Sequence, residues 1–236
     1  MIRADLRSSL QASDVELVLT VLSRGSGQRR AELEYRLAQD GPDALLDAPD
    51  LLDQLVAVRT MLAPSERLFL YVAMRHFLRA ADLDDRDLAD YLASLVLAFG
   101  ERERAFRIAG HDDQKHVYLV DILADLDASD GERRFQVMAH LGNYALWLSG
   151  LFPDYIAARR TRHGGPDVSY YDAMGRRGFD LAAGHALAGR YGLEDVFRTA
   201  AERFVALRAT LNGVSDRFLF PGVMSPGRIM RQLGVH

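Results

Sequence analysis

Residues 132–149, ERRFQVMAHLGNYALWLS, carry apolar side chains three and four residues apart, and this spacing recurs nearly throughout the chain. Sustained alternation of apolar and polar residues, the mark of a half-buried strand, is absent. Apolar residues at a period of 3.6 are typical of helices that bury one face. The sequence therefore predicts an all-α fold, a multi-helix orthogonal or bundle-like globular domain of roughly eight to ten helices.

The loop 161–166 is the clearest break in this helical pattern, because it combines two adjacent glycines with a proline. Asp167 follows it directly and is expected to cap a long helix that ends near residue 189. Residues 193–211 are expected to form the last long helix.

The 236 residues contain no linker rich in serine, glycine or proline that would separate two domains. We expect one helical protein with three parts. These are an N-terminal helical subregion (1–62), a main helical body (63–220) and a C-terminal tail packed on the body (221–236).

Composition excludes several classes of function. The chain has no cysteine, so disulfide frameworks, thiolate metal sites and a cysteine nucleophile are ruled out. A formal net charge of −4 gives no general attraction to nucleic acid or to anionic lipid. No apolar run approaches the roughly 20 residues of a membrane span, and the first residues do not read as a signal peptide. We expect a soluble, cytoplasmic protein that binds neither nucleic acid nor membranes.

The most distinctive segments are residues 142–155, GNYALWLSGLFPDY, and residues 167–177, DVSYYDAMGRR. They resemble a family of uncharacterised bacterial all-helical proteins with the pattern L-G-[DN]-x-x-L-x-x-S-G-[LF]-F-P followed by Y-Y-x-x-M-G. The resemblance covers roughly residues 115–220. It implies a bacterial source and a helical fold, and it implies no activity.

This region also holds the first group of candidate binding residues. His140, Asn143 and Trp147 share one face of the expected helix, and Tyr170 and Tyr171 open the helix after the glycine–proline loop. If the two helices meet, these side chains could line a pocket. The alternative is that they are ordinary core residues, and that the glycines nearby only permit close packing of helices.

Arg159 and Arg160, just before the same loop, form a second candidate group. Guanidinium groups can hold a phosphate, a carboxylate or an acidic partner. The alternative is a solvated turn whose arginines pair weakly with nearby acids.

A metal site is not predicted. Asp112, Asp113 and His116 have the spacing of metal ligands on a helix, but a di-iron bundle needs a Glu-x-x-His motif on two helices, and the chain has none. The aspartates fit better as the N-cap of a following helix.

The sequence predicts a non-enzymatic helical interaction or regulatory protein of the bacterial cytoplasm, because the P-loop, the dinucleotide-binding loop and the nucleophile elbow are all missing. A protein partner or self-association would use the region 136–177. The alternative is a helical protein that binds a small molecule or cofactor there, which could be an enzyme. No catalytic residue is named and no cofactor is predicted.

Overall fold

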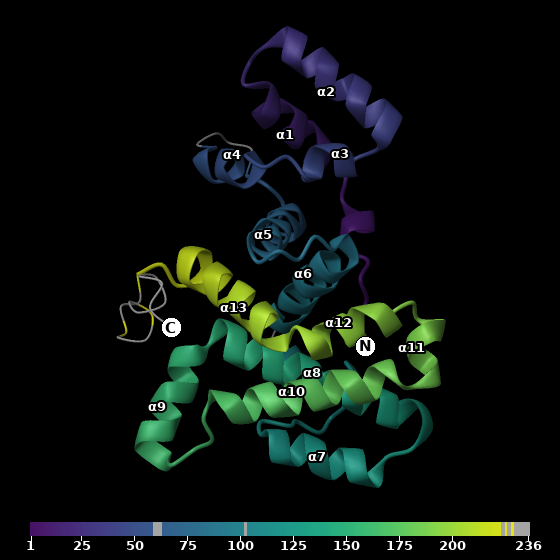
Figure 1. Cartoon of the computed structure of the whole chain (residues 1–236), viewed down its shortest axis with the longest axis vertical. Coiled ribbons are helices and arrows are strands. Elements are labelled where there is room, and N and C mark those ends of the chain that lie inside the picture. Colours follow the sequence, from purple (N-terminus) through teal and green to yellow (C-terminus); the bar gives the residue numbers. More distant parts are fainter. Residues whose placement is uncertain (59–62, 102, 223–224, 226–227, 229–236) are drawn as a thin grey trace. The chain divides into compact units, whose positions relative to one another are not determined.

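The protein is described from a computed structural model, which covers residues 1–58, 63–101, 103–222, 225 and 228. These residues form helices and no strand, which confirms the all-α fold class (Figure 1). None of the described helices is long and apolar enough to cross a membrane.

The chain divides into two compact units. The N-terminal unit contains residues 4–97, and the C-terminal unit contains residues 98–236 together with Met1–Arg3. Residues 63–97 therefore group with the N-terminal unit, whereas the division expected from the sequence assigned them to the main body.

The N-terminal unit is built from short helices around a leucine-rich core. Its elements are η1 (Arg7–Ser9), α1 (Ala12–Ser23), α2 (Gly27–Asp40), α3 (Asp43–Leu46), α4 (Leu51–Ala57), α5 (Glu66–Ala80) and α6 (Arg86–Gly100) as far as residue 97. Serine and aspartate side chains start the two longest core helices: Ser65 accepts the Leu68 N–H, and Asp85 accepts the Leu88 N–H.

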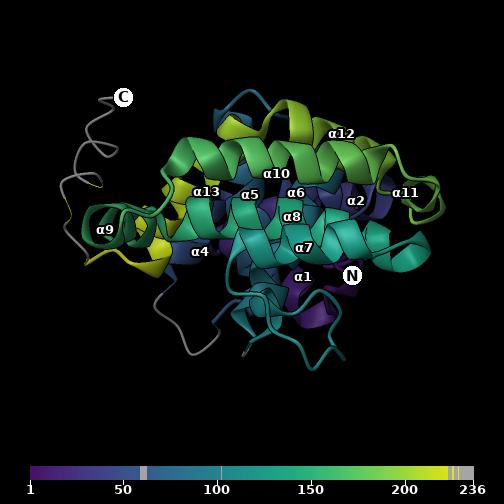
Figure 2. The same ribbon diagram turned by 90° about the horizontal axis from the view of Figure 1, so that it is seen from below.

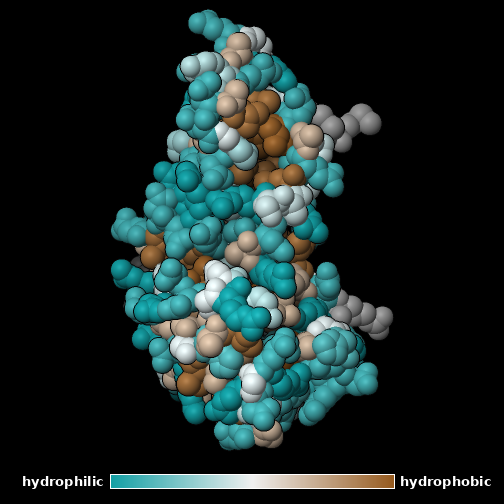
Figure 3. Space-filling model, turned by 90° about the vertical axis from the view of Figure 1, so that its right-hand side faces the viewer, coloured by the Kyte–Doolittle hydropathy of each residue, from teal (hydrophilic) through white to brown (hydrophobic). Residues whose placement is uncertain are grey.

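An apolar patch lies on the surface of this unit (Figure 3). The unit also contains a small groove of about 190 Å³. Its apolar lining residues are Leu10, Val15, Val18, Pro42, Leu45, Leu46 and Leu68.

The C-terminal unit is arranged around one long buried helix, α8 (Gly131–Leu151). The other elements of this unit are η2 (Arg104–Phe106), α7 (Leu119–Ala128), α9 (Pro153–His163), α10 (Val168–Ala183), α11 (Ala186–Arg190), α12 (Glu194–Glu202), α13 (Phe204–Val214) and η3 (Ser215–Leu219). Figure 2 shows α7 and α10 running alongside α8. Apolar side chains surround most of α8, which is the pattern of a helix at the centre of a core.

The closest approach between α8 and α10 occurs where two glycines face each other. A Cβ atom on Gly178 would lie 2.4 Å from the backbone nitrogen of Gly142 and 2.9 Å from the carbonyl oxygen of Met138. The absence of side chains at both positions lets the two backbones touch. The packing interpretation of the glycines is therefore confirmed at this crossing.

Several expected helix limits were wrong. Asp112 and Asp113 do not cap a helix, since α7 begins at Leu119 with Tyr118 as its N-cap residue. The helix that Asp167 caps ends at Ala183, and a separate short helix, α11, follows it.

The segment expected as the last long helix is also divided in two. It consists of α12 and α13, which meet at Arg203. Most of the tail 221–236 lies outside the described residues. Of its described members, Arg228 is buried and pairs with Asp154 and Asp216.

Candidate binding groove

A groove of about 480 Å³ lies in the C-terminal unit, where the first turns of α7 and α10 come near the last turns of α9. Figure 1 shows the beginnings of α7 and α10 at the same end of α8. We call it the tyrosine groove. It is lined by Val117, Tyr118, Leu119, Val120, Tyr144, Arg159, Pro166, Tyr170 and Tyr171. Its volume and its largely apolar, aromatic lining are those of sites that bind organic ligands or partner side chains.

Tyr144 connects this groove to the core. Its side chain extends from α8 and is only 2% exposed. Its hydroxyl donates a hydrogen bond of 2.6 Å to the backbone carbonyl oxygen of Val117, so the segment before α7 is fastened to α8. Burial raises the pKa of Tyr144 above its usual range, so the hydroxyl stays protonated and remains a donor at neutral pH.

Arg159 supplies the positive charge of the groove. Of the described lining residues it alone is charged. Its guanidinium carbon lies 4.5 Å from the centroid of the Tyr118 ring, a cation–π contact. A guanidinium carries five N–H donors, so Arg159 can contact this ring and also donate to a ligand.

Tyr170 and Tyr171 belong to the first turn of α10 and pack edge to face, with ring centroids 5.9 Å apart. Tyr171 is 4% exposed, and burial raises the pKa of its hydroxyl, while the positive charge of Arg159 opposes that rise. Asp167 holds this turn in place by accepting the Tyr170 N–H. The groove therefore offers protonated phenols and one guanidinium as its side-chain donors.

The polar side-chain groups of this lining are phenol hydroxyls and one guanidinium. Among the described lining residues there is no histidine, carboxylate, serine, cysteine or lysine. The groove can orient an apolar or aromatic group and neutralise one negative charge.

The candidate residues from the sequence are only partly brought together. Arg159, Tyr170 and Tyr171 line the groove. Arg160 does not line it; its side chain is 64% exposed and lies 3.7 Å from the carboxylate of Asp167.

His140, Asn143 and Trp147 lie on the side of α8 that faces an aromatic cluster in the core. The Trp147 ring is 5.7 Å from the Phe99 ring, and His140 and Asn143 are each 3% exposed. The imidazole Nε2 of His140 has no hydrogen-bond partner among the described residues, and burial lowers the pKa of His140 to about 3. These three residues do not line the tyrosine groove.

The residues considered for a metal have other roles in the structure. Asp112 accepts the backbone N–H of Ala109 and pairs with Arg133 at 2.6 Å. His116 is fully buried, with Nε2 at 3.3 Å from Asp125. Among the residues described, no group of three or more histidines and carboxylates could hold a metal ion, and Asp113 takes part in none.

Sequence reasoning missed Tyr118 and Tyr144. Tyr144 lies within the distinctive segment 142–155 and on the same helix face as His140 and Trp147, whose rings are 6.0 and 5.9 Å from its own, but it was not named as a candidate. Its contact with Val117 joins residues 27 positions apart, and no local pattern reveals such a contact.

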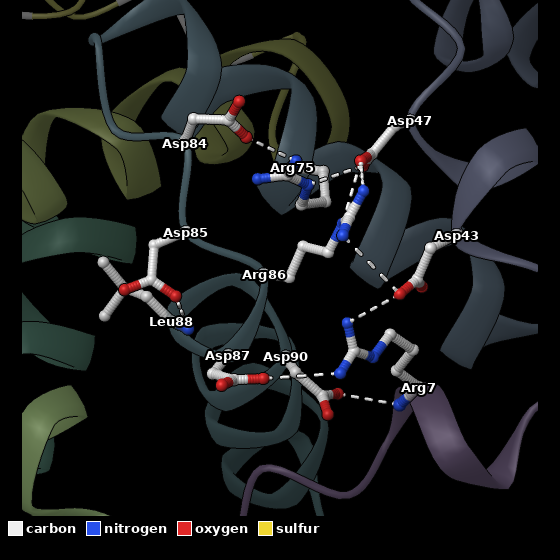
Figure 4. Close-up of polar contacts among 10 residues, drawn as sticks. All are labelled: Arg7, Asp43, Asp47, Arg75, Asp84, Asp85, Arg86, Asp87, Leu88 and Asp90. Carbon is white, nitrogen blue, oxygen red and sulfur yellow. Dashed lines mark hydrogen bonds and ion pairs between the residues drawn. The ribbon is translucent and has the colours of Figure 1, made fainter. Parts of the chain in front are cut away.

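A second polar cluster lies in the N-terminal unit, where arginines and aspartates form an ion network (Figure 4). Arg75 is 3% exposed; its Nε donates to Asp47 at 2.8 Å and its Nη2 to Asp84 at 2.6 Å. Asp47 also pairs with Arg86; burial acts to raise the pKa of Asp47, but the hydrogen bonds from Arg75 and Arg86 together hold that pKa below its usual value. Because the buried guanidinium of Arg75 is paired with two carboxylates, the network is explained as structural.

Comparison with known proteins gives no match to a family model, to a curated protein or to a solved structure. The resemblance of residues 115–220 to a bacterial helical family therefore stays a prediction.

Proposed function

We propose that this chain is a non-enzymatic helical interaction protein and that the tyrosine groove is its contact site. The observation that carries the proposal is the lining itself: four tyrosines and one arginine around an apolar groove of about 480 Å³. Tyrosine and arginine are the residue types that, with tryptophan, dominate the binding energy of protein interfaces.

Exposure of neighbouring apolar side chains supports this proposal. Tyr118 is 47% exposed and Val120 is 62% exposed, while Tyr155 on α9 is 48% exposed. Large apolar side chains that gather beside a groove and remain open to solvent are a common feature of interaction sites. A bacterial cytoplasm as the location belongs to the proposal and is tested by fractionation of the source cells.

The proposal is tested by capture with matched variants. Immobilised wild-type protein, Tyr118→Ala and Tyr170→Ala are each exposed to a lysate of the source organism. The control is Tyr35→Ala, which removes a tyrosine that is 67% exposed on α2. We expect a protein that the wild type and the control retain and that both groove variants lose. Equal retention by all four proteins, or a wild type that is monomeric and retains nothing, contradicts the proposal.

The volume of the groove favours a second candidate, a binding protein for a small organic molecule. A volume of about 480 Å³ lies within the range of roughly 300–1,000 Å³ typical of such sites. Native mass spectrometry of the protein as purified distinguishes the two: a stoichiometric added mass that Tyr118→Ala removes supports the small-molecule candidate.

A further inference from the structure

We infer that the segment of a partner protein received by the tyrosine groove is acidic: an aromatic or branched apolar side chain enters the groove, and a neighbouring carboxylate binds Arg159. This inference rests on the proposed function, because it describes the partner of the same site. Its basis is the charge balance of the elements that form the groove.

Four aspartates on or beside these elements already have partners. Asp121 accepts the N–H of Tyr118, Asp154 pairs with Arg228, Asp167 accepts the N–H of Tyr170, and Asp172 pairs with Arg208. None of these aspartates lines the groove.

Arg159, by contrast, has no carboxylate partner among the described residues. It is half-buried, and its guanidinium contacts the Tyr118 ring. An arginine held by an aromatic face keeps its in-plane donors in a fork that matches the two oxygens of a carboxylate. The groove therefore contains one guanidinium that can donate hydrogen bonds to a negatively charged group of a ligand.

The surroundings strengthen the same preference. The last turn of α9 carries Arg160, Arg162 and His163, and no acidic residue. A partner that approaches this end of the unit meets positive charge beside an apolar groove, which favours acidic segments and slows basic ones. The apolar lining requires that the negative group be accompanied by an apolar side chain.

The experiment is a selection from a random heptapeptide library displayed on phage, with folded wild-type protein as the target. Enriched phage are counted again on Arg159→Gln and on the matched control Arg162→Gln, an exposed arginine of the same helix that does not line the groove. We expect enriched peptides to carry aspartate or glutamate next to an aromatic or branched residue. They should bind Arg162→Gln only slightly less well than wild type, because that arginine contributes general attraction and no groove contact, and they should be lost on Arg159→Gln.

A second measurement leaves the protein unchanged, so it holds even if Arg159→Gln folds poorly. An enriched peptide is compared with its twin in which asparagine or glutamine replaces the acid. We expect the acidic peptide to bind wild type at least about tenfold more tightly than its twin, with the difference shrinking as salt is added. Equal affinity of the twins overturns the inference.

The outcomes also separate this inference from the proposed function. If the enriched peptides lack acidic residues but their binding depends on Tyr118, the groove is still a contact site and the inference of an acidic partner is refuted. Acidic peptides that bind Arg159→Gln as well as wild type refute the role of Arg159. A selection that enriches no peptide overturns the inference, and if capture from lysate is also independent of the groove, the proposed function falls with it.

Discussion

The glycine contact between α8 and α10 gives the sharpest prediction for the fold, the effect of Gly178→Ala. The new Cβ would lie 2.4 Å from the Gly142 nitrogen, whereas ordinary contacts begin at about 3.4 Å. The two backbones must therefore separate by about 1 Å at this point. Backbone atoms cannot rotate away as a side chain can. The loss in the free energy of unfolding from this overpacking should therefore be about 3 kcal/mol, at the top of the typical range of about 1–3 kcal/mol.

Part of this loss is offset, because alanine stabilises the interior of a helix by about 1 kcal/mol relative to glycine. We expect a net loss of about 2 kcal/mol in the free energy of unfolding, or about 4–8 °C in melting temperature for a chain of this length. Urea unfolding followed by circular dichroism measures it. The control is Gly184→Ala at the end of α10, where the new Cβ meets nothing closer than 3.7 Å and φ is −74°.

We expect Gly184→Ala to change the free energy of unfolding by less than about 0.5 kcal/mol. If Gly178→Ala is as stable as Gly184→Ala, then the close contact of the two helices is not present in solution and the reasoning fails.

Three further predictions concern buried polar groups. Burial lowers the pKa of His140 to about 3, so the unfolded chain, with a histidine pKa near 6.5, binds a proton that the folded chain does not. Stability from this group is complete above about pH 6.5 and is lost as the pH falls toward about 3. The loss reaches about 2 kcal/mol near pH 5, so between about pH 7 and pH 5 the free energy of unfolding should fall by about 2 kcal/mol more in wild type than in His140→Phe, measured by urea unfolding; equal falls in the two proteins would contradict it. Tyr144→Phe removes a buried hydroxyl that holds the groove wall, and should cost about 1 kcal/mol and weaken any groove ligand; unchanged stability and binding would count against this tether. Asp47→Asn leaves Arg75 with one carboxylate partner and should cost about 3 kcal/mol, against at most about 1 for Asp50→Asn in an exposed pair; similar losses in the two thermal melts would contradict the network's role.

The helical fold could be predicted from the spacing of apolar residues and from capping residues. The structure shows where these local patterns do not give the correct ends of the helices. The cap at Asp167 was predictable, since an aspartate after a glycine–proline loop has one favourable role. Asp112 also follows a glycine, Gly110, by a short distance, but it closes a turn onto Ala109 and pairs with Arg133 from α8. That arginine lies 21 residues away, and no capping rule includes it.

The breaks that divide the last helices were missed for a related reason. The helix expected to continue to about residue 189 ends at Ala183, and His185 caps the next helix, α11, by accepting the Leu187 N–H through its imidazole. Histidine is not among the residues that a sequence is usually searched for as helix caps. Arg203 separates α12 from α13 without a glycine or a proline. Neither break could be predicted from the local sequence alone.

The groove was half predictable. The expected loop 161–166 is shorter in the structure, because α9 continues to His163; Arg159 near the end of α9 and Tyr170 and Tyr171 at the start of α10 lie on either side of this turn, so their proximity follows from chain connectivity. The helix face of His140 and Trp147 was judged by spacing alone, which identifies a shared face but not what covers it. That face meets aromatic rings of the core, and of its residues only Tyr144, whose ring contacts those of His140 and Trp147, also lines the groove.

The contact of Gly142 with Gly178 also bears on the groove, because Tyr144 is carried by one of the two helices and Tyr171 by the other. The distance between α8 and α10, and with it the separation of the two phenol rings, therefore depends on two glycines that do not line the groove. A mutation at either glycine would alter the groove's selectivity from a distance, so tolerance to change there should be low even for variants that still fold.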